Sequence, residues 1–365
     1  MSIAITPHTE DLCLVVTERC NLHCTYCQSN KSFSRTMSWE CAKAYIDKYL
    51  TVCDTLHPSF TFMGGEPFIA FTLIKTIVDY VKANYPRKQV TYTIVTNGTL
   101  VHRDIQHWIL LHEDQVHVTL SLDGLGEEHD INRCDSLKRI DLEFFRQLRN
   151  PVVNTVFTPE TVDRMAATTI ALQDKGFMVK GFVADGEKWM DRDVNIIAQQ
   201  LALLIDYYME HPQIPPMSLL AQPIYYLIFA KGIRRCGTSD YTEVSVSADG
   251  RLWACHRCSP FENHGSWKIP EHLLSLSEAK HLLEECKDCR MEKICNVCPA
   301  SNASIMEDKK LAETTCAIRK LLFKANAYFV MNMLASETEY AGIRHLDAQR
   351  RIQTFESAKA ILNLL

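Results

Sequence analysis

Residues 17–29 read TERCNLHCTYCQS and directly follow an apolar run that is typical of a β-strand. Within this stretch Cys20, Cys24 and Cys27 form a C-x3-C-x2-C run. An odd number of cysteines in so tight a loop excludes a disulfide framework. Three thiolates can instead ligate three irons of a 4Fe-4S cluster and leave the fourth iron open. The alternative is structural zinc, because His23 could complete a set of four ligands.

The composition is that of an ordinary globular protein. Its 365 residues suffice for a large core and for two domains, or for one domain with an extension. Hydrophobic residues make up 47% and charged residues 23%, and a formal net charge of -5 gives no basic field for nucleic acid. The first residues lack the features of a signal peptide, and no apolar run reaches the ~18 residues of a membrane span. We therefore expect a cytoplasmic protein with neither nucleic acid nor membrane as a partner.

Most of the 15 cysteines fall into two groups. So many thiols indicate a reducing cytoplasm and a use in metal binding rather than in disulfides. One group lies at 20–27 and the other between 236 and 316. The remaining cysteines are scattered, and we expect them to be ordinary buried or surface thiols: Cys13, Cys41, Cys53 and Cys134.

Strand-like runs alternate with helical patterns through the first half of the chain. The strand-like runs lie at 12–17, 59–63, 90–96, 116–122, 152–157 and 178–183. The helical patterns lie at 38–53, with Ser38 as a candidate cap, and at 71–84, 102–112, 138–149 and 160–175. This alternation predicts an α/β fold with a parallel sheet, but there are too few units for a full eightfold barrel. In such barrels the chemistry lies at the carboxyl ends of the strands.

Polar motifs follow the second and third strand-like runs. MGGEP comes after the second, at 63–67. Its glycines leave backbone groups open to a ligand, and the Glu66 carboxylate can accept from an ammonium group. Thr96-Asn97-Gly98 follows the third run and is by itself most simply a turn.

A longer motif, SLDGLGEEHDINR at 121–133, follows the fourth strand-like run. Asp123 could either cap a turn or contact a ligand. We expect His129 and Asp130 to belong to local loop structure.

A second set of cysteines lies in the last third of the chain. Cys236, Gly250 and Cys255 form a C-x13-G-x4-C pattern. A C-x2-C-x5-C-x2-C run and a single cysteine follow, at Cys286, Cys289, Cys295, Cys298 and Cys316. Two C-x2-C pairs could form a zinc ribbon, but zinc does not explain the other cysteines economically. The segment EVSVSADGRLWACHR at 243–257 predicts a β-hairpin with Asp249-Gly250 at its turn.

The three-cysteine run with Tyr26, the GGE at 64–66 and the segment at 121–133 together resemble the radical S-adenosylmethionine (SAM) superfamily. The resemblance implies a partial (β/α)6 barrel and a 4Fe-4S cluster on Cys20, Cys24 and Cys27. It implies that the open iron chelates the amino and carboxylate groups of SAM, which is then reduced to a 5'-deoxyadenosyl radical. It also implies a set of SAM-binding residues, with the GGE at the amino group and the last two at the ribose or carboxylate: Tyr26, Gly64, Gly65, Glu66, Ser121 and Arg133.

The later cysteines resemble the SPASM extension of radical SAM enzymes, which holds two auxiliary 4Fe-4S clusters and brings the expected total to three. By this pattern the first auxiliary cluster takes Cys236, Cys255 and Cys298. The second takes Cys286, Cys289, Cys295 and Cys316. The chain departs from the family at 296–297, because members usually have three residues between these cysteines. For a fourth ligand of the first cluster we favour Cys258, in C-x2-C spacing with Cys255; the alternatives are an open iron and a free Cys258 thiol.

Pattern and resemblance together predict four segments. They are a radical SAM barrel over 1–190, a helical linker over 191–235, a SPASM domain over 236–320 and C-terminal helices over 321–365. The linker pattern runs over 193–232 with a break at 211–216, and the terminal helices are expected at 317–335 and 346–365.

SPASM enzymes mostly act on peptides or proteins, and GRLWACHR around Cys255 resembles a string of maturases that crosslink ribosomal peptides. The resemblance implies a maturase that abstracts hydrogen from a ribosomal precursor peptide and installs an oxidative crosslink, with an electron donor such as flavodoxin or ferredoxin. No catalytic side chain follows from the sequence. Because only nineteen residues precede Cys20, we expect the barrel and extension, or a separate protein, to recognise any leader peptide.

Two alternatives stay open. The first is a formylglycine-generating, sulfatase-maturing enzyme. His256 stands where such relatives have an acidic base, which argues against the sulfatase-maturing alternative without excluding it. The second is a non-catalytic iron–sulfur or zinc protein.

Overall fold

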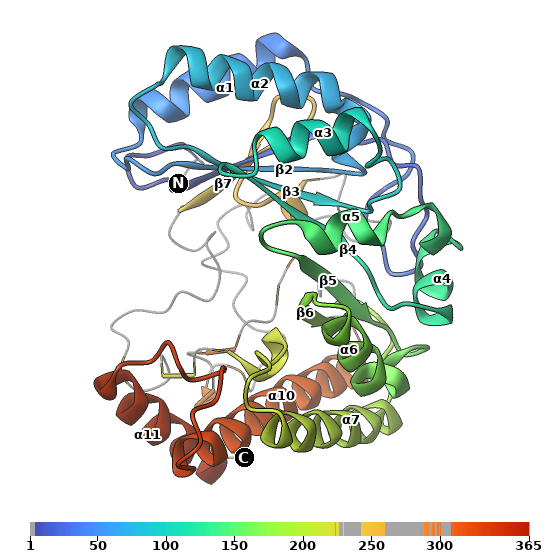
Figure 1. The fold of residues 1–365 in the computed structure, drawn as a ribbon, viewed down its shortest axis with the longest axis vertical. Coiled ribbons are helices and arrows are strands. Elements are labelled where there is room, and N and C mark those ends of the chain that lie inside the picture. The colour runs from blue at the N-terminus through green and yellow to red at the C-terminus, as the bar shows by residue number, and fades with distance from the viewer. Residues whose placement is uncertain are drawn as a thin grey trace. The chain divides into compact units, whose positions relative to one another are not determined.

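The computed structural model describes residues 4–222, 224–225, 229, 242–259, 286, 288–291, 294–295, 298, 300 and 308–364 (Figure 1). The chain divides into two compact units. The first comprises Met1–Ser121, His129–Val152 and Cys236–Lys280, and the second comprises Leu122–Glu128, Val153–Arg235 and His281–Leu365. The cysteine run at 20–27 and Cys255 therefore belong to the first unit.

A parallel sheet forms the centre of the first unit. Its strands β1 (Asp11–Thr17), β2 (Ser59–Gly64), β3 (Thr91–Thr96) and β4 (Val116–Ser121) each pair in parallel with the next. The aromatic rings of Phe60, Phe62 and Tyr92 stack in the core, and the Phe62 and Tyr92 centroids are 5.8 Å apart. Because the strands are parallel, the motifs that follow them meet at one edge of the sheet.

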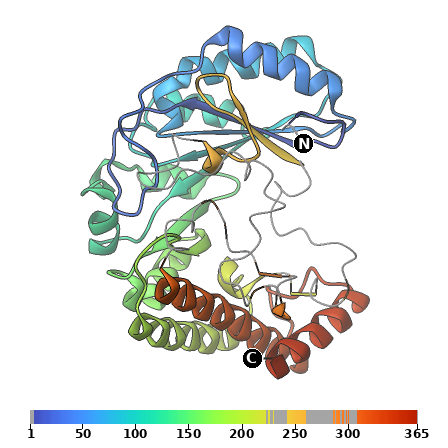
Figure 2. The same cartoon turned by 180° about the vertical axis from the view of Figure 1, so that it is seen from behind.

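Helices cover one face of this sheet (Figures 1 and 2). They are α1 (Trp39–Val52), α2 (Phe71–Asn84) and α3 (Asp104–Leu111). The cap predicted at Ser38 is confirmed, since its hydroxyl accepts from the Cys41 amide at 3.1 Å. A short turn, Pro67–Ala70, leads from β2 into α2. The helix predicted at 138–149 is shorter, because a 3-10 turn at Leu137–Arg139 precedes α5 (Leu142–Gln147).

The predicted hairpin is confirmed and also joins the sheet. Strand β7 (Glu243–Val246) pairs antiparallel with β8 (Leu252–Trp253). Gly250 takes φ 82° at the turn, a left-handed conformation that favours glycine. On its other side β7 pairs in parallel with β1, from Asp11 opposite Glu243 to Leu14 opposite Val246. A short turn, His256–Cys258, follows β8.

In its described residues the second unit contains two strands and the long helices. The strands are β5 (Val152–Phe157) and β6 (Met178–Val183). The helical elements are Val162–Arg164, α6 (Met165–Asp174), α7 (Asp191–Glu210), Ser218–Leu220, α10 (Lys309–Ala335) and α11 (Ala348–Leu364). Figure 2 shows α7 beside α10, where the rings of Tyr208 and Phe329 lie 5.8 Å apart. The aliphatic faces of these helices are thus packing surfaces.

Two helical expectations were wrong. His129 and Asp130, expected in local loop structure, lie in helix α4 (Glu127–Arg133). His129 in it is fully buried, and its Nε2 lies 3.0 Å from Ser136 Oγ. The terminal helix predicted from 317 begins earlier, at Lys309, because the Asp308 carboxylate caps it.

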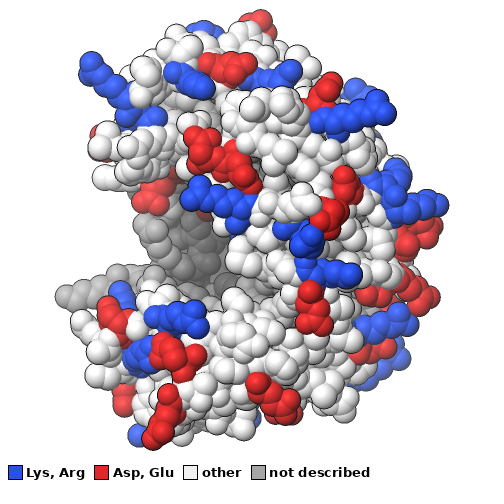
Figure 3. All heavy atoms as spheres, viewed as in Figure 1, with Lys and Arg blue, Asp and Glu red and all other residues white. Residues whose placement is uncertain are grey.

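The described surface carries charges of both signs. Figure 3 shows Lys and Arg interspersed with Asp and Glu over the face in view. Among the helices in the described ranges, none combines the length and the apolarity needed to cross a bilayer.

Candidate functional site

The cysteine loop, residues 18–29, starts at the carboxyl end of β1. Thr17, the last residue of that strand, accepts from the Arg19 amide at 3.2 Å, and its hydroxyl contacts that of Thr36 at 3.1 Å. Leu22 is buried at 2% exposure and fastens the middle of the loop to the core. These contacts fix the cysteine loop to the end of β1 and to the core.

The two glycines after β2 pack directly against this loop. The Gly65 amide donates to Thr17 O at 3.0 Å, and the Glu66 amide donates to Arg19 O at 2.9 Å. A Cβ at Gly65 would lie 2.3 Å from Arg19 O, and one at Gly64 would lie 2.1 Å from Thr17 O. Sequence reasoning gave these glycines room for a ligand and missed that the loop backbone occupies their side-chain positions.

Glu66 joins the ends of β2 and β3. Its carboxylate is 1% exposed and accepts from Phe68 N at 3.1 Å, Thr96 Oγ1 at 2.7 Å and Asn97 N at 2.7 Å. Burial raises the pKa of Glu66 to about 7, although these hydrogen bonds oppose the rise. Near neutral pH the protonated and the ionised forms of this carboxyl group are therefore both populated.

The Thr96-Asn97-Gly98 motif also holds the cysteine loop. The side-chain Nδ2 of Asn97 donates to Asn21 Oδ1 at 2.9 Å, and Asn21 Nδ2 donates to Thr99 Oγ1 at 2.8 Å. Asn97 Oδ1 in turn accepts from the Thr99 hydroxyl at 2.7 Å. The interpretation as a turn overlooked Asn21 and Thr99, whose signal was an amide directly after the first cysteine and a TNGT run directly after a strand.

The carboxyl end of α4 lies along the same loop. Arg133 is 6% exposed, donates to the Tyr26 hydroxyl and has its guanidinium carbon 5.4 Å from the Tyr26 ring centroid. Its Nη1 lies 4.0 Å from Cys24 Sγ. Asn132 O accepts from the Thr25 amide at 2.9 Å, which fixes this approach.

The other residues of the 121–133 motif lie elsewhere. Ser121 ends β4 and is half-buried. The buried Asp123 carboxylate accepts from Val156 N at 2.9 Å, which favours the local structural role for it. Asp130 accepts from Leu137 N at 3.1 Å, also a local role.

Lys31 is a neighbour of all three thiols that the sequence did not single out. Its Nζ donates to Cys27 Sγ at 3.3 Å. Burial lowers the pKa of Lys31, but the thiols of Cys27, Cys20 and Cys24 outweigh it and raise that pKa overall. Burial also raises the pKa of Cys20, whose Sγ accepts from Leu22 N at 3.4 Å. All three thiols thus interact electrostatically with one cation, and Cys27 contacts it directly.

The donor set fits an iron–sulfur cluster better than one zinc ion. Among the described residues, no three His, Cys, Asp or Glu side chains converge so that they could hold a single metal ion. Tetrahedral zinc needs such convergence, whereas each thiolate of a 4Fe-4S cluster binds a different iron. The His23 side chain is exposed, while the N–H groups of Lys31 and Arg133 face the thiols as donors to sulfur.

In the second unit one thiol, that of Cys316, interacts electrostatically with three others. Cys316 lies inside α10, and burial raises the pKa of its thiol. The nearby Lys320 opposes that rise, and the neighbouring thiols add to it: Cys286, Cys295 and Cys289. Turns shape their segment, since Cys289 N donates to Cys286 O at 3.2 Å and Cys295 N donates to Met291 O at 2.9 Å.

Cys255 and Cys258 flank one turn in the first unit. Cys258 is 3% exposed, and its amide donates to Cys255 O at 2.9 Å. Arg257 in the same turn donates to Gln28 Oε1 at 3.2 Å, directly beyond Cys27. The half-buried His256 has its Nδ1 3.7 Å from Cys255 Sγ. Cys236 lies outside the described residues, and Cys298 is half-buried in the second unit.

Comparison with protein families and curated proteins gives matches over part of the chain. Residues 11–132 match the family described as a 4Fe-4S single cluster domain. An uncharacterized protein of Methanocaldococcus jannaschii is 42% identical over 122 residues, which are 33% of this chain and 41% of that protein. The radical SAM cyclopropyl synthase TigE of Paramaledivibacter caminithermalis is 30% identical over 171 residues, 41% of this chain and 36% of TigE. A cysteine-type anaerobic sulfatase-maturating enzyme of Clostridium perfringens is 34% identical over 127 residues, 32% of this chain and 33% of the enzyme. The chain thus spans well under half the length of these curated relatives.

Solved structures match over most of the chain. Native anSMEcpe with bound AdoMet and the Cp18Cys peptide superposes with a TM-score of 0.66 at 21% identity, covering 87% of this chain and 96% of that one. Streptococcus suis SuiB bound to the precursor peptide SuiA gives a TM-score of 0.59 at 16% identity, covering 83% of this chain and 74% of SuiB. These likenesses confirm the predicted fold, a radical SAM barrel followed by a cysteine-rich C-terminal region.

The cysteine loop, the fold and these matches agree: part of the chain is similar in sequence to 4Fe-4S and radical SAM proteins, and the chain shares its fold with anSMEcpe and SuiB.

Proposed function

We propose that this protein cleaves SAM reductively at a 4Fe-4S cluster on Cys20, Cys24 and Cys27 and acts on a peptide or protein. The observation that carries the proposal is the placement of these three cysteines in one loop at the carboxyl end of β1, held by hydrogen bonds to the ends of β2, β3 and α4, with Lys31 in contact with Cys27. When bound, such a cluster supplies the electron that splits SAM into methionine and a 5'-deoxyadenosyl radical. The chain's own part is to bind and orient SAM and substrate.

The SAM-binding residues we propose are those that surround the loop. Glu66 would accept from the SAM ammonium, because its carboxylate is held at the same edge of the sheet by three donors. Arg133 would face the SAM carboxylate or ribose, because its guanidinium lies against Tyr26 and Cys24. Tyr26, Gly64, Gly65 and Ser121 complete the proposed set.

Two auxiliary clusters follow from the remaining cysteines. Support for the second one is the electrostatic interaction of the Cys316 thiol with its three proposed partner thiols. For the first we propose Cys236, Cys255 and Cys298 with Cys258 as fourth ligand. Clusters there would accept the electron that substrate oxidation releases. We propose flavodoxin or ferredoxin as electron donor, and the cytoplasm as location.

The preferred substrate is a ribosomal precursor peptide in which an oxidative crosslink or related modification is installed. TigE, a radical SAM cyclopropyl synthase by name, and SuiB, solved with a precursor peptide, support this choice. A sulfatase is the second candidate. The 34% identity to a sulfatase-maturating enzyme and the TM-score of 0.66 to anSMEcpe with a bound peptide favour it.

The first experiment asks for SAM cleavage. Anaerobically reconstituted protein with dithionite and SAM should yield 5'-deoxyadenosine, measured by liquid chromatography with mass spectrometry. Replacing Cys20, Cys24 and Cys27 by Ala should abolish the product while iron stays bound elsewhere. A Cys41→Ala/Cys53→Ala variant, outside the proposed ligand sets, should keep it. Unchanged cleavage in the triple variant, or no cleavage in the native protein, would refute the proposal.

A second experiment separates the substrates. The protein is co-expressed with a small peptide encoded beside it, and in parallel with a sulfatase peptide that carries the target Cys or Ser. A crosslinked or otherwise oxidised gene-neighbour peptide, seen by tandem mass spectrometry, supports the maturase. Formylglycine in the sulfatase peptide instead would show the second candidate to be correct.

A further inference from the structure

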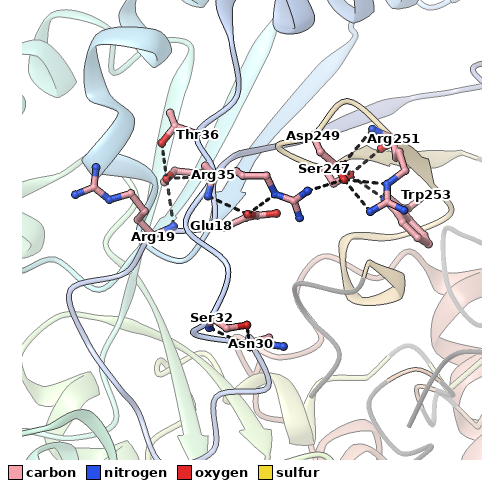
Figure 4. Close-up of polar contacts among 11 residues, drawn as sticks. Glu18, Arg19, Asn30, Ser32, Arg35, Thr36, Ser247, Asp249, Arg251 and Trp253 are labelled. Carbon is pink, nitrogen blue, oxygen red and sulfur yellow. Dashed lines mark hydrogen bonds and ion pairs between the residues drawn. The ribbon is translucent and has the colours of Figure 1, made fainter. Parts of the chain in front are cut away.

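A chain of polar contacts joins the start of the cysteine loop to the β7–β8 hairpin (Figure 4). Arg35 Nε lies 2.9 Å from Glu18 Oε2, and the Arg35 amide donates to the same oxygen at 3.0 Å. The Nη1 atom of Arg35 lies 2.9 Å from Asp249 Oδ2 in the hairpin turn. One guanidinium thus spans two carboxylates that are more than 200 residues apart in the sequence.

The hairpin end of this chain is held firmly. Asp249 accepts from Ser247 Oγ and from Arg251 Nε, the latter at 2.9 Å. Burial works against ionisation of Asp249, but these hydrogen bonds outweigh it and bring its pKa to about 2. Trp253 Nε1 donates to Ser247 Oγ at 2.9 Å, and the Arg251 guanidinium lies over the Trp253 ring. Asp249 is therefore a fixed anion in the turn.

The loop end of the chain depends on Arg35. Glu18 is 1% exposed, and within the described part of the chain its Oε1 has no hydrogen-bond partner. Exposed ion pairs contribute little to the free energy of folding, but a buried carboxylate needs a counter-charge to offset the loss of its hydration. Arg35 is the cation on its paired oxygen, so the position of Glu18, two residues before Cys20, is tied to Arg35.

A second bridge lies at the other end of the cysteine loop. Arg257 Nη1 donates to Gln28 Oε1 at 3.2 Å, one residue after Cys27. The sheet itself ties the two segments only up to Leu14 and Val246, where the β1–β7 pairing ends. Beyond that point the arginines connect them, one on each side of Cys20, Cys24 and Cys27.

We infer that Arg35 and Arg257 are positioning residues that hold the Cys255–Cys258 turn at a set place against the cysteine loop. The inference rests on the proposed function, in which this turn serves an auxiliary cluster. It follows that without the two bridges SAM cleavage proceeds but is less well coupled to substrate oxidation. The arginines act through the segments they join and touch neither SAM nor thiols in this role.

Hydrogen exchange of the metal-free protein tests the bridging directly. In an Arg35→Lys/Arg257→Gln variant, the single lysine amine can serve only one carboxylate, and the buried Glu18 is the costlier one to leave unpaired. Amides at 247–259 should then exchange about tenfold faster or more, while those of β1 keep their protection. Arg251→Gln is the matched control, since Arg251 also pairs with Asp249 but does not reach the loop. Exchange there should stay close to native.

An Asp249→Ala/Arg257→Gln variant leaves the Glu18–Arg35 pair intact, and decides the question if the lysine variant fails to fold. Native exchange at 247–259 in this variant would overturn the inference. In the reconstituted enzyme, iron content should stay native, and the deoxyadenosine released per modified substrate should rise in the double variants; an unchanged ratio would also overturn it. A native protein that makes no deoxyadenosine refutes the proposed function instead, and leaves the exchange result standing.

Discussion

Replacing Gly65 by Ala should displace the cysteine loop. The added Cβ would lie 2.3 Å from Arg19 O and 2.8 Å from Cys20 Cβ. To restore ordinary van der Waals contact the Arg19 carbonyl must move by about 1 Å, and no side-chain rotation can relieve the clash because the obstacle is backbone. The shift would be applied directly at the first cysteine of the loop.

The energetic cost of this substitution has two sources, overpacking and weaker hydrogen bonds. Overpacking of this kind costs about 1–3 kcal/mol. The hydrogen bonds from Gly65 N to Thr17 O and from Glu66 N to Arg19 O would weaken as well, at about 1 kcal/mol each. We expect the free energy of unfolding to fall by about 2–4 kcal/mol. We also expect the loop to lose its iron and SAM cleavage to fall with it.

Urea unfolding of the metal-free protein measures the first effect, and iron analysis after reconstitution measures the second. Gly126→Ala is the control, because a Cβ there would lie 3.5 Å from its nearest neighbour, Glu128 Oε2. If Gly65→Ala matched Gly126→Ala in both stability and iron content, close packing of the glycine against the loop would not be its role.

The remaining predictions concern the buried carboxyl group and the auxiliary clusters. With the pKa of Glu66 raised from 4.5 to about 7 in the folded protein, its contribution to stability is full below pH 4.5 and is lost as the pH rises through 7. The free energy of unfolding of the native protein, measured by urea titration at a series of pH values, should therefore fall by on the order of 3 kcal/mol across this range. It should vary less with pH in Glu66→Gln, and parallel pH profiles for the two proteins would contradict this. Elemental analysis should find about twelve irons per chain, whereas about four irons with one or two zincs would mean that the later cysteines bind zinc. Cys258→Ala should change the cluster spectrum without removing SAM cleavage; a native spectrum that shifts on adding substrate would instead indicate an open iron.

Strands and strand-end motifs could be predicted because their signals are local. Each of the six barrel strands begins and ends within one residue of its prediction, since β-branched runs bounded by turn residues are read directly from the sequence. Parallel topology then places Cys20, Glu66 and Asn97 at one edge. The hairpin at Asp249-Gly250 was equally local.

What escaped prediction depends on contacts between distant segments. The role of Gly65 comes from the backbone of Arg19, 46 residues earlier, which no local pattern reveals. Lys31 becomes a neighbour of the thiols only when the loop folds back, and Asn21 finds Thr99 only through the sheet. Helix α4 was missed because its short polar sequence is typical of a loop, and the burial of His129 within it depends on the folded chain.

The pairing of β1 with β7 has a consequence for synthesis of the chain. Leu14 and Val246, which face each other in this pairing, are about 230 residues apart. At the usual 5–20 residues per second a ribosome needs roughly 10–50 s to make the intervening chain. During that interval one edge of β1 carries unsatisfied N–H and C=O groups, which are a template for other strands. A chain truncated before Glu243 would keep that edge open permanently, and it should aggregate at concentrations where the full chain remains monodisperse by light scattering.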